Sequence, residues 1–231
     1  MALKRTGPAT LDRVGSDCGD EVDDCGPAEI TRRTVVIAIR TLRVSGAESL
    51  ACHEAVELAA LGYEVEVWYQ IDGPFRAGLV RVGVKAVRVP LWSGRRRTRR
   101  LSQRAYGRLV IHTHSQSSGA FLRLVSLGTD NVAFIHTEHN VSAAYRPVIR
   151  MVHRLMAWRI DELVAVSSAA LETAPPTRRR RVLHHMDLTL PRMQACLALP
   201  PKLDGPLRVA CVASLTEKKD HANLLGALII L

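Results

Sequence analysis

The chain has 231 residues, of which 47% are apolar and 23% charged, so it can bury a substantial core. This composition excludes a wholly disordered protein and a small scaffold held together by disulfides. No stretch approaches the roughly eighteen apolar residues of a transmembrane helix, and residues 1–30 hold no apolar signal segment. The five cysteines form no CxxC pair, which favours a reducing, cytoplasmic location.

The net charge of +10 is unevenly distributed along the chain. Residues 1–31 hold three basic and seven acidic residues, a net charge of −4, which leaves +14 for the remainder. Residues 73–129 hold twelve Lys and Arg and no acidic residue, and seven of the twelve lie in 95–108. Such a run is either a solvated face or a surface attracted to an anionic lipid leaflet or to nucleic acid. Because only 4% of residues are aromatic, we expect no nucleic-acid partner.

Strand and helix patterns alternate from residue 34 onwards, after a tail (1–33) without hydrophobic periodicity. An apolar run predicts a buried strand at 34–39, followed by a helix that ends before Gly62 and a strand at 63–68. Further strands are predicted at 84–89, 109–112, 131–135, 163–166 and 182–184, and helices at 95–108, 118–127 and 147–159. In the last helix we expect an inward apolar face of Val148, Met151, Val152, Leu155 and Met156. The alternation predicts an α/β, Rossmann-like doubly wound fold with a mostly parallel sheet.

The end of the chain is predicted to begin a second domain. Residues 190–206 contain four prolines and no clear period, which indicates a linker. Residues 207–213 then predict a buried strand with Cys211 in the core, and a helix follows from about Asp220. One strand and one helix cannot bury their own apolar faces, so we expect a truncated α/β domain at 207–231 behind a first domain at 34–189.

The first predicted turn carries small residues at the start of a helix, namely Ser45, Gly46 and Ala47. Small residues let backbone N–H groups approach a phosphate, and the helix N-terminus favours negative charge. The spacing is not GxGxxG, and no acidic residue ends the second strand, so an ordinary structural turn is the alternative.

Polar side chains follow the fourth and fifth predicted strands, where ligands of open α/β sheets bind. They are His112, His114 and Ser115 after one strand, and His136, Glu138, His139 and Asn140 after the other. Histidine can orient or deprotonate a hydroxyl, and Glu138 can steady an imidazole or accept a hydrogen bond from a sugar hydroxyl. Packing by hydrogen-bonded histidines is the alternative.

Two other chemistries are weighed at these residues. A zinc site could be made from His112, His114 and His139, but no HExxH helix or CxxC pair is present, so we expect no metal. A hydrolase is not expected, because Ser115 lacks the flanking glycines of a nucleophile elbow. Near the end of the chain, Lys219 could neutralise a diphosphate, or lie in a solvated loop with Asp220 as a helix cap.

Five ordered motifs resemble the GT-B glycosyltransferases, specifically the retaining family 4 type. The first is the turn at 45–48 (SGAE) with the helix end at 60–65 (ALGYEV). The others are 110–115 (VIHTHS), 137–140 (TEHN), 161–167 (DELVAVS) and 209–221 (VACVASLTEKKDH). The resemblance spans residues 34–231.

This resemblance implies a two-domain enzyme without metal or cofactor. Its N-terminal domain would bind a sugar or lipid-linked acceptor, and its second domain a nucleoside-diphosphate sugar. It implies that Gly46 and Ala47 lie near the donor phosphates, that His114 lies at the reaction centre and that Lys219 stabilises the leaving diphosphate. The acceptor residues would be His112, Ser115, Glu138, His139 and Asn140. A basic surface of Arg95, Arg96, Arg97, Arg99 and Arg100 would hold the protein peripherally at the inner membrane leaflet.

The chain departs from the family pattern at several positions. Ser214 stands where the family has an arginine, Asp220 where it has a glycine, and residues 184–187 are one residue short of the usual motif. The acidic E-x7-E segment and the base pocket would lie beyond residue 231. We therefore expect weak donor binding and slow or absent turnover. A non-catalytic remnant or acceptor-binding module is the alternative, and a basic nucleic-acid-binding α/β protein is a less favoured one.

Overall fold

The computed structural model describes residues 33–90, 93–184, 209–213, 215 and 217–230, and the chain divides into two compact units between His185 and Met186. Each unit is described by itself. Apart from Arg33, the predicted tail at 1–33 lies outside the described residues, as does the predicted linker at 190–206. Neither prediction is tested.

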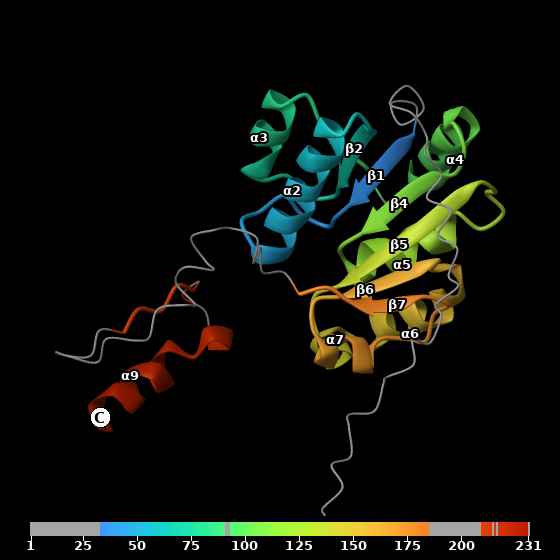
Figure 1. The fold of residues 1–231 in the computed structure, drawn as a ribbon. Helices are drawn as coiled ribbons and strands as arrows, with labels where there is room; N and C mark the ends of the chain where they lie inside the picture. The colour runs from blue at the N-terminus through green and yellow to red at the C-terminus, as the bar shows by residue number, and fades with distance from the viewer. Residues whose placement is uncertain (1–32, 91–92, 185–208, 214, 216, 231) are drawn as a thin grey trace, which may run out of the picture. The chain divides into compact units, whose positions relative to one another are not determined.

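The first unit contains a seven-stranded, wholly parallel sheet with the order β3-β2-β1-β4-β5-β6-β7 (Figure 1). The strands are β1 (Thr34–Ala38), β2 (Glu64–Tyr69), β3 (Lys85–Arg88), β4 (Leu109–Thr113), β5 (Val132–Glu138), β6 (Glu162–Ala165) and β7 (Arg180–Val182). The order reverses between β1 and β4, which confirms the predicted doubly wound fold. Because all strands are parallel, their carboxyl ends lie along one edge of the sheet.

Helices cover the two faces of this sheet unequally (Figure 1). Helices α2 (Gly46–Ala60) and α3 (Phe75–Arg81) lie on one face, where Ala51 and Ala55 of α2 pack against Ile37 and Val67 of the sheet. On the other face lie α4 (Gly94–Arg104), α5 (Gln116–Val125), α6 (Pro147–Leu155) and α7 (Ser168–Thr173), with short 3-10 turns at Ser142–Ala144 and Ala157–Arg159. The α2 face is therefore left open over β4 and β5.

Several predictions about local structure in the first unit differ from the structure, including the last strand, which was predicted at 182–184 and lies at Arg180–Val182. Val148, Met151 and Leu155 of α6 were expected to face the core, but their exposed fractions are 64%, 55% and 66%. The fully buried residue of this helix is His153, which has polar partners inside the unit. Strand β5 also continues three residues beyond its predicted end at residue 135, because Glu138 still pairs with Ala165 of β6. In addition, α3 was not predicted.

The second unit contains the helix α9 (His221–Ile230), preceded by a 3-10 turn at Glu217–Lys219. The helix was predicted correctly. Residues 209–213 form no strand, and Val212 is fully exposed, so the predicted buried strand is wrong over those residues. Cys211 is exposed rather than part of a core. A strand persists only where neighbouring strands complete its hydrogen bonds, and none of the described residues does so here.

Helix α5 approaches β4 so closely that a glycine is required at position 119. A Cβ atom on Gly119 would lie 2.7 Å from the Thr113 hydroxyl oxygen and 3.1 Å from an Arg123 guanidinium nitrogen. We predict that Gly119→Ala lowers the free energy of unfolding by about 1–3 kcal/mol, measured by urea denaturation. The control is Gly78→Ala in α3, where a Cβ meets no atom within 4 Å. That variant should be neutral or slightly stabilising, and equal effects of the two substitutions would contradict the packing argument.

Candidate functional site

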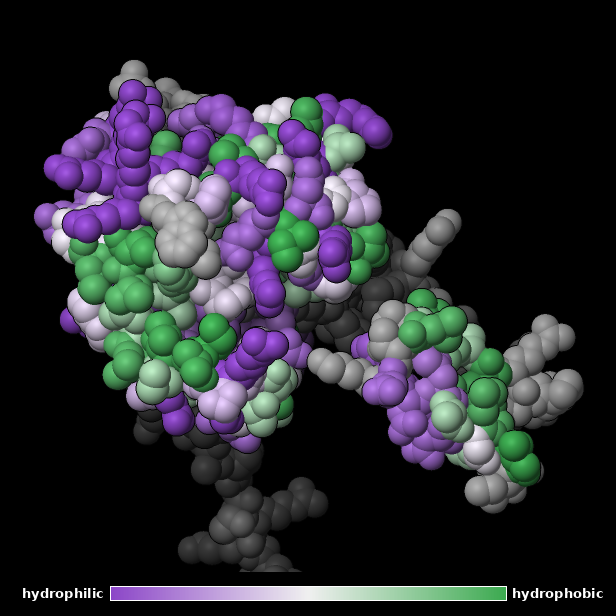
Figure 2. All heavy atoms as spheres, turned by 180° about the vertical axis from the view of Figure 1, so that it is seen from behind, coloured by the Kyte–Doolittle hydropathy of each residue, from purple (hydrophilic) through white to green (hydrophobic). Residues whose placement is uncertain are grey.

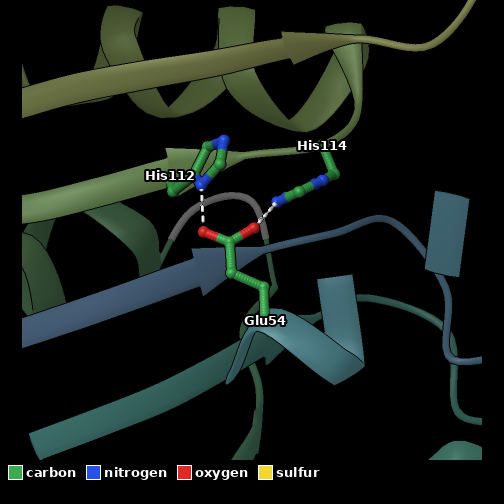
Figure 3. A group of neighbouring side chains, drawn as sticks. All are labelled: Glu54, His112 and His114. Atoms are coloured by element: carbon green, nitrogen blue, oxygen red, sulfur yellow. Dashed lines mark hydrogen bonds and ion pairs between the residues drawn. The ribbon is translucent and has the colours of Figure 1, made fainter. Parts of the chain in front are cut away.

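A carboxylate joins two histidines at the carboxyl end of β4, on the open face of the sheet (Figure 3). His112 and His114 are two residues apart, so their side chains point to the same face. Glu54 reaches them from α2: one carboxylate oxygen contacts Nδ1 of His112, and the other lies 3.0 Å from Nε2 of His114. We refer to Glu54, His112 and His114 as the front cluster.

The remaining ring nitrogens of the front cluster are held by residues at the end of β5. Nε2 of His112 lies 2.8 Å from the hydroxyl oxygen of Thr137, and Nδ1 of His114 lies 3.2 Å from Nε2 of His139. The β4–β5 pairing, with His112 beside Ile135, brings these residues together. Both imidazoles are therefore fixed in orientation from two sides.

The front cluster borders a pocket of about 520 Å³, which Glu54 and His112 line together with apolar residues such as Val110 and Ile135. The side chains of His112 and Glu54 are 12% and 27% exposed, whereas that of His114 is only 1% exposed. Burial raises the pKa of the Glu54 carboxyl, but the hydrogen bonds from His112 and His114 outweigh it and lower this pKa to about 2. Glu54 is therefore an anion at neutral pH.

Four of the predicted phosphate and acceptor residues lie near the ends of elements around this site. Gly46 and Ala47 begin α2, the helix that carries Glu54 two turns later, and Ser45 makes no side-chain cap there. A Cβ on Gly46 would meet no protein atom within 4 Å, so packing alone does not require a small residue. Ser115 precedes α5, and its hydroxyl lies 3.1 Å from that of Ser117. Asn140 is exposed, and its amide lies 3.4 Å from the Tyr145 hydroxyl.

Glu138 is the centre of a second polar group on the opposite face of the sheet. Its side chain is 1% exposed, and its carboxylate oxygens lie 3.1 Å from Nε2 of His136, 2.9 Å from Nε2 of His153 and 2.8 Å from the amide nitrogen of Gln116. Because its carboxylate is buried and already hydrogen-bonded, Glu138 does not make the predicted contact with a sugar hydroxyl. Its other predicted role, to steady an imidazole, fits the geometry. We call Glu138, His136, His153 and Arg123 the rear cluster.

A chain of charges runs through the rear cluster. Arg123 is fully buried, and its guanidinium donates to Nδ1 of His153 over 2.8 Å. Since arginine can only donate, Nδ1 of His153 must accept, and its proton is on Nε2, facing Glu138. Burial raises the pKa of the Glu138 carboxyl, but the bonds from His136 and His153 lower it strongly overall. Burial lowers the pKa of His136 to about 3 and also lowers that of His153. At pH 7 the two histidines are neutral, and the cationic Arg123 balances the anionic Glu138, so the cluster carries no net charge.

Residues 45–185 match the family described as a glycosyl transferase 4-like domain, which is well over half of the chain. The chain belongs to this family. Among solved structures it is similar to HepE of Anabaena in complex with UDP and glucose, with a TM-score of 0.54 and 13% sequence identity over 66% of this chain. Structures of HepE with UDP (TM-score 0.53, 14% identity) and with UDP-glucose (0.54, 13%) each cover 65% of this chain. The fold is therefore of the GT-B type.

The chain spans less than half the length of these structures, 44% of the first and 43% of the other two. A search of the curated proteins found no match. The family match ends at residue 185, so Lys219 of the second unit lies outside it. Lys219 is exposed, on the 3-10 turn that precedes α9.

The predicted basic surface of this glycosyl transferase 4-like protein lies mainly on α4. Arg95, Arg96, Arg99 and Arg100 are exposed. Arg97 instead turns inward: its guanidinium lies 2.8 Å from the carboxylate of Glu66 and over the ring of Trp68. Glu66 is buried within β2, which explains why one arginine of the run is drawn toward the sheet. None of the helices in the described part of the chain is long and apolar enough to cross a membrane.

Sequence reasoning missed three residues that organise the two clusters, namely Glu54, Arg123 and His153. One sequence feature could have indicated Glu54: it is a charged residue on a predicted helix, next to the inward alanine Ala55. A similar feature could have indicated His153, which is a polar residue among residues assigned to an inward apolar face. Arg123 had no distinguishing signal within a basic segment.

The rear cluster predicts that the protein loses stability at mildly acidic pH. In the unfolded chain His136 titrates near the ordinary histidine pKa of 6.5, whereas in the fold it stays neutral down to about pH 3. The unfolded state then binds more protons over this range, so the free energy of unfolding falls as pH falls, by up to about 1.4 kcal/mol per pH unit for each such histidine. His153 acts in the same direction. Urea denaturation at pH 7, 6 and 5 measures the slope.

The matched control for this measurement is His53→Asn, because His53 is exposed on α2 with a 72% exposed side chain. It should leave the slope unchanged. A stability that does not vary between pH 7 and pH 5 would refute the neutral state assigned to the buried histidines.

Proposed function

We propose that this protein acts in retaining transfer of a sugar from a nucleoside-diphosphate sugar to a saccharide or lipid-linked acceptor. The observation that carries this proposal is the family match over residues 45–185, which includes the front cluster and the end of β5 that holds its histidines. The likeness to HepE, solved with UDP and glucose, supports a nucleotide-sugar donor. Placement of the polar groups at the carboxyl edge of the sheet supports a ligand site there.

In this proposal the front cluster lies where acceptor and donor meet. His114 is enclosed between Glu54 and His139 with only 1% of its side chain exposed, so in this proposal it holds these two residues in place at the reaction centre. His112 and Glu54 have the more open surfaces, and they face the pocket that would admit an acceptor hydroxyl. When the bond between the sugar and the diphosphate breaks, negative charge develops on the diphosphate. The N–H groups that begin α2 at Gly46 are suited to stabilise that charge. For Lys219 the same role rests on the resemblance to the family alone.

The transfer proposal is tested by measuring release of nucleoside diphosphate from a panel of sugar nucleotides, with saccharide and lipid-linked acceptors. We expect slow release with one donor, and product of unchanged anomeric configuration by NMR. Lys219→Ala and His114→Asn should each lower the rate by about 100-fold. Gly46→Ala should lower it without loss of stability, because a Cβ there meets no protein atom.

The control for this assay is His53→Asn, which should retain the full rate because the His53 side chain is 72% exposed and is paired with Glu57 rather than with the front cluster. If the chain binds saccharides but no sugar nucleotide, as followed by saturation-transfer NMR, it is an acceptor-binding module rather than a transferase. Equal rates for the wild type and the Lys219 and His114 variants would overturn the proposed roles.

We also propose that the face formed by α4, α5 and α6 binds an anionic membrane surface. Figure 2 shows this face with hydrophilic side chains gathered toward α4 and hydrophobic ones below them. The hydrophobic residues are exposed along α6 and the turn after it, at Val148, Met151, Leu155 and Trp158. Cationic side chains beside an exposed apolar stripe are what an interfacial helix presents to anionic lipid. The polar partners that bury His153 are the cause of this exposure.

The membrane proposal predicts binding to vesicles of anionic phospholipid at low salt and none to neutral vesicles, measured by co-sedimentation. Reversing two charges on α4 with Arg96→Glu and Arg99→Glu should lower the partition coefficient at least about tenfold, since each basic residue near the surface contributes about 1 kcal/mol. Met151→Ser with Leu155→Ser should also lower it. The control is Arg81→Glu on α3, on the other face of the sheet. Equal binding by Arg81→Glu and the α4 variant would refute the assigned face.

A further inference from the structure

Five arginines line a pocket between α4 and the β2–β3 edge of the sheet. Its volume is about 370 Å³, which is within the range of pockets that bind small molecules. Glu66 of β2 is the only carboxylate among the described residues that line it. We call this pocket the arginine pocket. Its arginines are Arg88 of β3 and Arg96, Arg97, Arg100 and Arg104 of α4.

Two of the five guanidinium groups are held in place by the protein. Nε and Nη2 of Arg97 both donate to Oε2 of Glu66, over 3.2 and 2.8 Å, and the guanidinium lies over the ring of Trp68. Nε of Arg88 donates to the backbone oxygen of Gln70 over 3.1 Å. Within the described part of the chain, the two Nη groups of Arg88 have no protein acceptor, so they remain available to a ligand in the pocket.

The other three arginines form a stripe along α4. Arg96, Arg100 and Arg104 are spaced four residues apart, so their side chains lie on the same side of the helix. All three are exposed, and none has a carboxylate partner among residues 33–90 and 93–184. Like charges at this spacing destabilise a helix. A bound anion would therefore remove a repulsion that the free protein has to bear.

The charge balance of the arginine pocket indicates the kind of ligand. Glu66 neutralises Arg97, which leaves four arginines without a counter-ion among the described residues. A guanidinium binds phosphate through two parallel hydrogen bonds, and a terminal phosphate group carries a charge of about −1.5 to −2 on three acceptor oxygens. Two such groups would balance four arginines, whereas a phosphodiester brings a single charge. We propose that the arginine pocket binds a ligand with terminal phosphate groups, as a pyrophosphate or a phosphomonoester.

This inference goes beyond the membrane surface proposed above. That surface depends on positive charge near a leaflet, whereas the arginine pocket distinguishes one kind of phosphate from another and needs no lipid. Arg99 separates the two proposals, because it is exposed on α4 but does not line the pocket. The inference is also independent of sugar transfer, because its test needs neither donor nor acceptor. Terminal phosphates occur on soluble compounds and on lipid headgroups, so the test has an arm for each source.

The first arm is calorimetric titration of the 231-residue chain with inorganic pyrophosphate. We expect one equivalent to bind, and Arg88→Gln and Arg104→Gln each to weaken binding at least about tenfold. Both side chains are exposed, so these variants should keep the fold, as monitored by circular dichroism. Arg99→Gln is the matched control, with the same change of charge on the same helix outside the pocket. Because exposed charges are screened by salt, it should alter the affinity by less than about twofold.

The second arm compares vesicles of phosphatidic acid, a phosphomonoester, with vesicles of phosphatidylglycerol, a phosphodiester, at matched surface charge by co-sedimentation. A preference for phosphatidic acid that Arg88→Gln removes assigns the pocket to a lipid headgroup. Binding of pyrophosphate with equal retention on both kinds of vesicle assigns it to a soluble ligand. Arg99→Gln should lower retention on phosphatidylglycerol without altering the affinity for pyrophosphate, so the membrane proposal and this one can fail separately.

Two results would overturn the arginine pocket as a phosphate site. One is the absence of pyrophosphate binding together with equal retention on the two kinds of vesicle. The other is an equal effect of Arg88→Gln, Arg104→Gln and Arg99→Gln on the affinity for pyrophosphate. Equal losses would show attraction to positive charge in general, and unchanged affinities would place the bound pyrophosphate elsewhere on the protein.

Discussion

The register between β4 and β5 determines where the polar chemistry of this protein lies. His112 pairs with Ile135 and Thr113 with His136, and side chains alternate between the faces of a sheet. Consecutive polar residues at the two strand ends are thereby divided: His112, His114 and Thr137 point to one face, and His136 and Glu138 to the other. A shift of one residue in this pairing would exchange the two sets. The histidines of β4 could then no longer contact Glu54, and the group around Glu138 would be separated from its partners on α5 and α6.

Each face supplies a partner for these polar side chains from a helix. On the open face Glu54 of α2 binds both histidines of β4, while on the covered face Arg123 of α5 and His153 of α6 complete the group around Glu138. A buried charge is stable only when it is paired and hydrogen-bonded, and an unpaired one costs several kcal/mol. The rear cluster therefore fixes the rotation of α6. The exposed apolar stripe of that helix follows from this electrostatic requirement rather than from any shortage of apolar residues.

The fold was predictable because its strands are short apolar runs separated by glycine-terminated helices. Gly62 has a φ of +92°, as expected at a helix end, and the sheet formed by the predicted strands follows from their alternation with helices. The rotation of α6 was not predictable from periodicity. The spacing of apolar residues places Met151 and Leu155 toward the core, and it takes no account of the polar partners that bury His153. Residues 209–213 have the composition of a strand, but a strand's hydrogen bonds depend on neighbours that composition does not reveal.

The site was predictable only in part, and for a related reason. Strand ends are marked in the sequence, so His112, His114 and His139 could be placed together at one edge of a parallel sheet. A helix residue such as Glu54 meets them only through the packing angle of α2, which no local pattern encodes. That same helix begins at Gly46, so one rigid element links a turn suited to phosphate with the carboxylate that binds two imidazoles. Movement of α2 would change both together, which makes its packing on β1 and β2 the structural link between the two halves of the candidate site.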